Sequence, residues 1–154
     1  MSLTEIVQIL AAMIGSLGFA ILFNVRGSRL VAVSLGGGAA WALFLLLGFL
    51  LESEVLRYFL VALTVSLYAE LMARIFRSSA IVFITPCLIP LVPGASLYYT
   101  MTHALGDNLE GFLEKGGMTL KMAAALAVGI IASVVLVRTF VNAVRFLKEK
   151  RNSL

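Results

Sequence analysis

Five long apolar stretches restrict the fold of this chain more than any other feature. A helix needs about 20 mostly apolar residues to cross a bilayer, and only short polar segments separate these stretches. Of the 154 residues, 61% are hydrophobic and 13% charged, which is too apolar for a soluble domain of this length. We predict an all-α polytopic membrane protein with five transmembrane helices in one domain, residues 1–154. The spans are placed at about 3–23, 30–51, 55–75, 80–105 and 119–140, with a basic cytoplasmic tail at 141–154.

The first apolar stretch is expected to remain as a helix. The residues MSLTE carry no positive charge, and nothing after Phe23 resembles the cleavage site of a signal peptide. The longest expected loop, Gly106–Met118, is too short to bury a core of its own.

Metal binding, cofactors and catalysis have no support in the residues. The chain has one cysteine and one histidine, Cys87 and His103, so neither a thiol pair nor a histidine cluster can form. No nucleophile, base and orienting acid can be assembled either. Cys87 is expected to be a packing residue, and His103 is either an interfacial polar residue or a pH-sensitive gate. The chain is therefore expected not to be an enzyme.

Charged residues predict the orientation in the membrane. Basic residues follow the first, third and fifth spans, whereas acidic residues dominate the other connections. By the positive-inside rule, the N-terminus is outside and the basic C-terminus is cytoplasmic. The basic set is Arg26, Arg29, Arg74, Arg77, Arg145, Lys148, Lys150 and Arg151. The opposite set is Glu5, Glu52, Glu54, Asp107, Glu110 and Glu114, with Arg57, Lys115 and Lys121. The net charge of +4 thus reflects topology, and no nucleic-acid partner is expected.

All three prolines of the chain fall in the fourth span, at Pro86, Pro90 and Pro93. Proline has no N–H, so the carbonyls of Val82, Pro86 and Ile89 are expected to lose their helical partners. Lipid cannot replace those partners, and broken backbone at membrane depth persists only where it is buried in protein or lines a polar cavity. We predict a discontinuous fourth helix beside a substrate site. The alternative is a kink used only for packing.

The two sides of this break differ in polarity. A half-helix that begins near Gly94, with Ser96 just inside it, would present free N–H groups and a positive dipole end to a carboxylate. Carbonyls freed around Pro86 and Pro90 would accept from an ammonium group or a cation. The break therefore suits a zwitterionic solute.

Glu70 is the only acidic residue well inside an expected span, and Arg74 follows it by one helical turn. An ionisable group within the membrane is a functional hypothesis by default. Glu70 is either a proton-coupling site or the structural partner of Arg74.

Glycine-rich faces on several spans favour close helix packing. The run Gly36, Gly37 and Gly38 has a second interpretation, in which it loosens the second helix into another irregular region.

Two segments, GFAILFNVRG at 18–27 and YAELMARIFRSSAIVFITPCLIPLVPGASLYYTM at 68–101, resemble the small membrane subunit of the threonine/serine exporter family. The resemblance covers most of the chain. Its sharpest element is the motif P-x-x-P-G-x-x-x-Y, preceded by a Phe-Asn pair: Pro90, Pro93, Gly94 and Tyr98, with Phe23 and Asn24.

The resemblance implies a split transporter of the bacterial inner membrane, whose large subunit is a separate chain. It implies export of threonine and serine driven by the proton motive force. The substrate-binding residues would be Pro90, Pro93, Gly94, Ser96, Tyr98 and Asn24. Related two-chain members are associated with dicarboxylates such as succinate, so a dicarboxylate exporter subunit is one alternative. A structural or assembly subunit that does not contact substrate is another, and a homo-oligomer is possible.

Overall fold

A computed structural model describes residues 2–106 and 108–152, with side chains through Ala143. Every regular element in these residues is helical. The elements are α1 (Leu3–Leu22), α2 (Ser28–Leu50), α3 (Glu54–Ile75), α4 (Ile81–Leu88), the 3-10 turn η1 (Ile89–Leu91), α5 (Gly94–Leu105) and α6 (Leu109–Asn152). Four helices are long and apolar enough to cross a membrane, and the count is five if the bent pair α4–η1 and α5 forms one span. The prediction of an all-α polytopic protein is confirmed.

Local sequence signals set the ends of several helices. The hydroxyl of Ser2 accepts from the Glu5 N–H at 3.3 Å while the Glu5 carboxylate accepts from the Ser2 N–H at 2.9 Å, a capping box that starts α1. After α1, Asn24 adopts a φ of 58°. This left-handed residue lets the Val25 N–H reach the Ala20 carbonyl at 2.9 Å, which closes the helix end.

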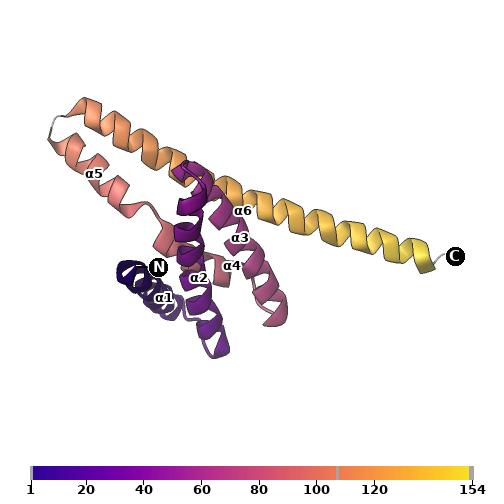
Figure 1. Cartoon of the computed structure of the whole chain (residues 1–154). Helices are drawn as coiled ribbons and strands as arrows, with labels where there is room; N and C mark the ends of the chain where they lie inside the picture. Colours follow the sequence, from indigo (N-terminus) through magenta and orange to yellow (C-terminus); the bar gives the residue numbers. More distant parts are fainter. Residues whose placement is uncertain (1, 107, 153–154) are drawn as a thin grey trace.

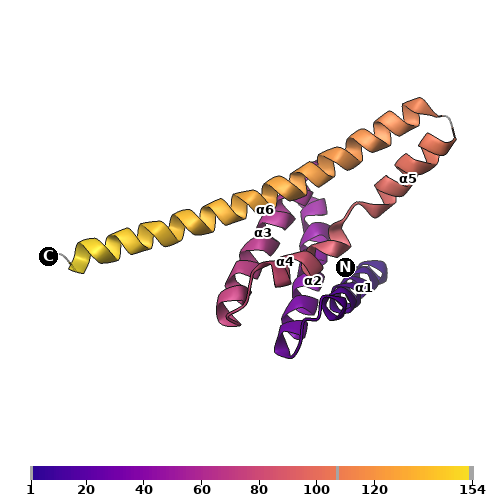
Figure 2. The ribbon, with the colours of Figure 1, turned by 180° about the vertical axis from the view of Figure 1, so that it is seen from behind.

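The helices pack around the short α4–η1 segment. Helix α1 packs on α2, and α4 contacts α1, α2 and α3. Phe83, Cys87 and Leu91 of this segment are almost completely buried, so α4–η1 forms the centre of the core. Helix α6 packs on α3 and α5, and its C-terminal part extends past the other helices on the side opposite the α5–α6 hairpin (Figure 1). Figure 2 shows the same hairpin and extension from behind.

The three glycines of α2 serve close packing. A Cβ on Gly36 would lie 2.7 Å from both the Cys87 sulfur and a ring carbon of Tyr68, and one on Gly38 would collide with Met13. Helix α2 is continuous from Ser28 to Leu50. The packing interpretation is therefore confirmed, and the alternative of an irregular region in the second helix is wrong.

The break in the fourth span contains fewer non-helical residues than the three prolines suggest. Pro86 lies inside α4 and Pro90 inside η1, so only Val92 and Pro93 separate the two helical parts, which meet at a bend of 56°. The expected loss of a partner for the Ile89 carbonyl is wrong, because the Val92 N–H donates to it at 3.1 Å. The 3-10 turn shifts the hydrogen bond by one residue and keeps this carbonyl paired.

The last helix is longer than the apolar stretch that predicted it. Helix α6 begins at Leu109 and has 44 residues, so the loop expected over Gly106–Met118 is wrong for nearly all of its length. Asn108 starts the helix, since its side-chain oxygen accepts from the Gly111 N–H at 2.9 Å. At 1.5 Å per residue the helix is roughly 66 Å long, about twice the hydrocarbon thickness of a bilayer. Asp107 and the side chains of Arg145, Lys148, Lys150 and Arg151, used to predict orientation, lie outside the described residues.

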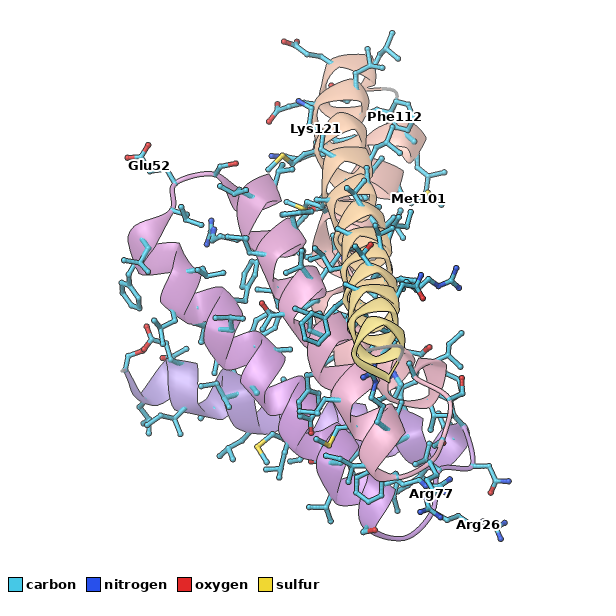
Figure 3. All side chains as sticks on the ribbon, turned by 90° about the vertical axis from the view of Figure 1, so that its right-hand side faces the viewer. Arg26, Glu52, Arg77, Met101, Phe112 and Lys121 are labelled. Atoms are coloured by element: carbon cyan, nitrogen blue, oxygen red, sulfur yellow. The ribbon has the colours of Figure 1, made fainter. Side chains whose placement is uncertain are left out.

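The connection between α1 and α2 and the connection between α3 and α4 lie together at one end of the molecule. Arg26 and Arg77 are close to each other at this end, whereas Glu52 and Lys121 lie toward the other (Figure 3). An Nη of Arg29 donates to the Phe76 carbonyl at 3.4 Å and ties the start of α2 to the end of α3. The separation of basic and acidic connections that the sequence suggests is thus present in three dimensions for these residues.

Candidate functional site

A cavity of about 720 Å³ lies where the fourth span breaks. Helices α2, α3 and α6 and the start of α5 all contribute to its lining. The residues that matter for its chemistry are Trp41, Glu54, Tyr58, Pro90, Pro93, Gly94, Ala95, Ser96, Glu114, Lys115 and Lys121.

The N-terminus of α5 supplies hydrogen-bond donors to this cavity. The Gly94 N–H is used by the Val92 carbonyl at 2.6 Å, and the Leu97 N–H by the Pro93 carbonyl at 3.0 Å. No described side chain caps the helix at Pro93. The N–H groups of Ala95 and Ser96 therefore have no acceptor among the described residues. Such free N–H groups, together with the helix dipole, favour an anion.

Charged side chains of both signs line the same cavity. Lys115 Nζ lies 3.3 Å from Glu114 Oε1, a pair exposed enough to be weak. Glu54 and Lys121 form no ion pair among the described side chains. One carboxylate and one ammonium are thus left for a ligand, and the four side chains together carry no net charge.

An aromatic cluster contributes Trp41 and Tyr58 to one side of the cavity. The rings of Trp41 and Phe44 have centroids 5.6 Å apart, and those of Phe44 and Tyr58 are 4.9 Å apart. The guanidinium of Arg57 lies 5.3 Å from the Phe44 centroid, in cation–π distance. The Thr100 hydroxyl lies 3.4 Å from the Thr119 hydroxyl, which connects α5 to α6.

The structure brings together some of the residues that the sequence proposed for substrate binding. Pro90, Pro93, Gly94 and Ser96 line the cavity. Tyr98 is not among the lining residues; its side chain is 65% exposed and its ring lies edge-on to that of Tyr99 at 5.7 Å.

Asn24 lies elsewhere, in the turn after α1. Its side-chain oxygen accepts from Nε of Arg26 at 2.9 Å. Arg26 is at the end of the molecule away from Lys121 (Figure 3), so its partner Asn24 lies away from the cavity. The left-handed backbone of Asn24 instead closes the end of α1.

Glu70 and Arg74 line a different hollow, of about 430 Å³, between α3 and α6. Its other lining residues are apolar: Leu67, Leu71, Leu136, Val137 and Phe140. Glu70 and Arg74 do not come within ion-pair distance in the described structure, although they share this hollow. A direct salt bridge, which the structural-partner alternative suggests, is therefore not formed between these described side chains, and neither residue lines the cavity at the break.

Sequence reasoning missed the charged part of the site. Glu114 and Lys121 are two helical turns apart on one face of α6, a spacing that would have indicated a shared surface. The expected loop through Met118 hides this spacing, because it places Glu114 outside any helix. In the sequence, Glu54 and Lys121 serve only as indicators of membrane orientation.

Helices that cross a membrane several times, with one of them broken beside a charged cavity, define a multi-pass integral membrane protein. The chain belongs to the threonine/serine exporter family, ThrE, whose pattern it matches over residues 8–136. Comparison with curated proteins and with solved structures finds no match.

Proposed function

We propose that the chain is the small subunit of a secondary exporter for small carboxylate-bearing metabolites, driven by the proton motive force, with threonine and serine as its substrates. The family membership supports export of these amino acids. The observation that carries the proposal is the N-terminus of α5, whose free Ala95 and Ser96 N–H groups lie in one cavity with Glu54 and Lys121. A solute carboxylate would bind the N–H groups and Lys121, and its ammonium group would bind Glu54.

The charge of the cavity favours an amino acid over a dicarboxylate. Glu54, Glu114, Lys115 and Lys121 sum to zero formal charge, which complements a zwitterion. A dianion such as succinate would leave the occupied cavity with a net charge of two negative units, whereas a zwitterion leaves it neutral.

A separate large subunit is proposed as the partner that completes the transporter. The cavity is open, and α5 exposes Leu97, Tyr98 and Met101 by more than half of their surface. In this proposal the protein lies in a bacterial inner membrane with its N-terminus outside and its C-terminus in the cytoplasm. The position of Arg26 and Arg77 at one end and Glu52 at the other supports that orientation (Figure 3).

Vesicle transport tests the proposal. The chain is co-purified with the large subunit and reconstituted, and uptake of labelled threonine, serine and succinate is measured under an imposed pH gradient. Threonine and serine are expected to accumulate, and succinate is not.

Gly94→Leu probes the site itself. Nothing lies within 4 Å of a Cβ placed on Gly94, so the larger side chain would fill the cavity without straining the fold. Gly18→Leu is the matched control, because a Cβ there also meets open space and Gly18 lines none of the cavities described above. Loss of transport in Gly94→Leu alone supports the proposal. Full transport in both variants would favour a structural subunit that does not contact substrate.

A further inference from the structure

The cavity at the break shares a wall with a second hollow. This hollow has a volume of about 290 Å³ and lies against α1. Trp41 and Pro90 line both spaces. The remaining lining residues of the second hollow are Gln8, Ala11, Ala12, Gly15 and Ile89.

The two residues of the shared wall differ in their freedom to move. Pro90 belongs to η1, which is anchored in the core by Leu91 at 1% exposure and by the adjoining end of α4, where Leu88 is 8% exposed. The indole of Trp41 is only partly buried and projects from α2. A change in its side-chain torsion angles would open the wall without moving the backbone.

A single hydrogen bond holds the indole in place from the α1 side. Trp41 Nε1 donates to Gln8 Oε1 at 3.3 Å. Apart from the indole, Gln8 is the one polar side chain among the described residues that line the second hollow, and it comes from a helix that otherwise offers Ala11, Ala12 and Gly15 there. The bond joins α1 to α2 at an exposed position, so it acts as a local latch between the two helices.

We propose that the two spaces are consecutive compartments of one solute pathway, with Trp41 as the movable partition between them and Gln8 as its latch. The inference rests on the proposed transport function. A zwitterionic solute held at the N-terminus of α5 passes Trp41 when the latch opens. The amide of Gln8, released from the indole, then offers a donor and an acceptor to that solute in the second compartment.

Fluorescence tests the partition directly, because Trp41 is the only tryptophan of the chain. The full-length protein is reconstituted into lipid vesicles, and quenching of its emission by aqueous acrylamide is measured. Gln8→Met is nearly isosteric and removes the acceptor. Thr4→Val, one turn earlier on the exposed side of α1, is the matched control. The quenching constant is expected to rise about threefold in Gln8→Met, the effect of losing one interhelical hydrogen bond, and to stay unchanged in Thr4→Val.

Cysteine labelling tests whether the second hollow becomes connected to water. Ala11→Cys places a thiol in its lining, and the native Cys87 is fully buried, so its background reaction is low. A membrane-impermeant thiosulfonate reacts only with a hydrated thiolate. Its reaction rate at position 11 is expected to rise in the Gln8→Met background.

The outcomes separate this inference from the proposed function. Increased quenching and labelling without transport of any amino acid would support the partition and overturn the transport proposal. Transport that proceeds while quenching and labelling stay at wild-type values in Gln8→Met would overturn the partition and leave the transport proposal standing.

Discussion

Gly129 of α6 lies so close to α3 that a Cβ on it would come within 2.8 Å of the Ala62 Cβ, and within 2.7 Å of the Phe59 carbonyl oxygen. The two backbones meet here with almost no side chain between them. Apolar side chains gain little by leaving lipid for another helix, so close van der Waals contact is the main attraction between membrane helices. This crossing fixes α6, and with it Lys121, against the rest of the molecule.

Gly129→Ala is expected to destabilise the protein by about 1–3 kcal/mol, because the added methyl group meets backbone atoms that cannot move aside. The free energy of unfolding is measured by denaturant titration in micelles. Gly18→Ala is the matched control, since a Cβ at Gly18 meets nothing within 4 Å. It is expected to be neutral or stabilising by up to about 1 kcal/mol, from helix propensity alone. Equal stability of the two variants would show that α3 and α6 leave room for a methyl group at Gly129.

Gly37 and Ser16 form a second close contact, between α2 and α1, where a Cβ on Gly37 would collide with the Ser16 hydroxyl. Gly37→Ala is expected to destabilise by about 1–3 kcal/mol. In the double variant with Ser16→Gly, the new methyl group on α2 faces a glycine on α1, so part of the lost stability should be restored. A double-mutant cycle measures the coupling, and strict additivity would refute direct contact.

Lys121→Met is expected to raise the KM for threonine about tenfold or more, the effect of losing a hydrogen bond to a charged group. Lys115→Met is the comparison, because Lys115 is already paired with Glu114 at 3.3 Å and should matter less. Initial transport rates against substrate concentration check this. Equal effects at both lysines would argue against the assigned role of Lys121.

Glu70→Gln tests proton coupling away from the substrate cavity. The variant keeps the size of the side chain but cannot ionise, so uptake is expected to lose its dependence on the imposed pH gradient while exchange without a gradient continues. Arg74→Gln is the companion variant, since Arg74 lines the same hollow. An unchanged pH profile in Glu70→Gln would remove Glu70 from the coupling mechanism.

The sequence alone determined the helical membrane class and the position of the broken span. These properties depend on local composition and on the missing N–H of proline. Each acts within one helix, so no knowledge of neighbours is needed to predict it. The glycines of α2 left two interpretations open, and only their contacts with other helices decided for close packing.

Only the tertiary structure decided which polar groups meet. Glu54 and Lys121 are far apart in the chain and reach the start of α5 because α6 begins at Leu109, folds back along α5 and crosses α3 at Gly129. The same packing places Asn24 and Glu70 away from the cavity. Convergence of charges depends on how helices cross, and crossing is set by contacts between distant small residues rather than by any pattern within one span.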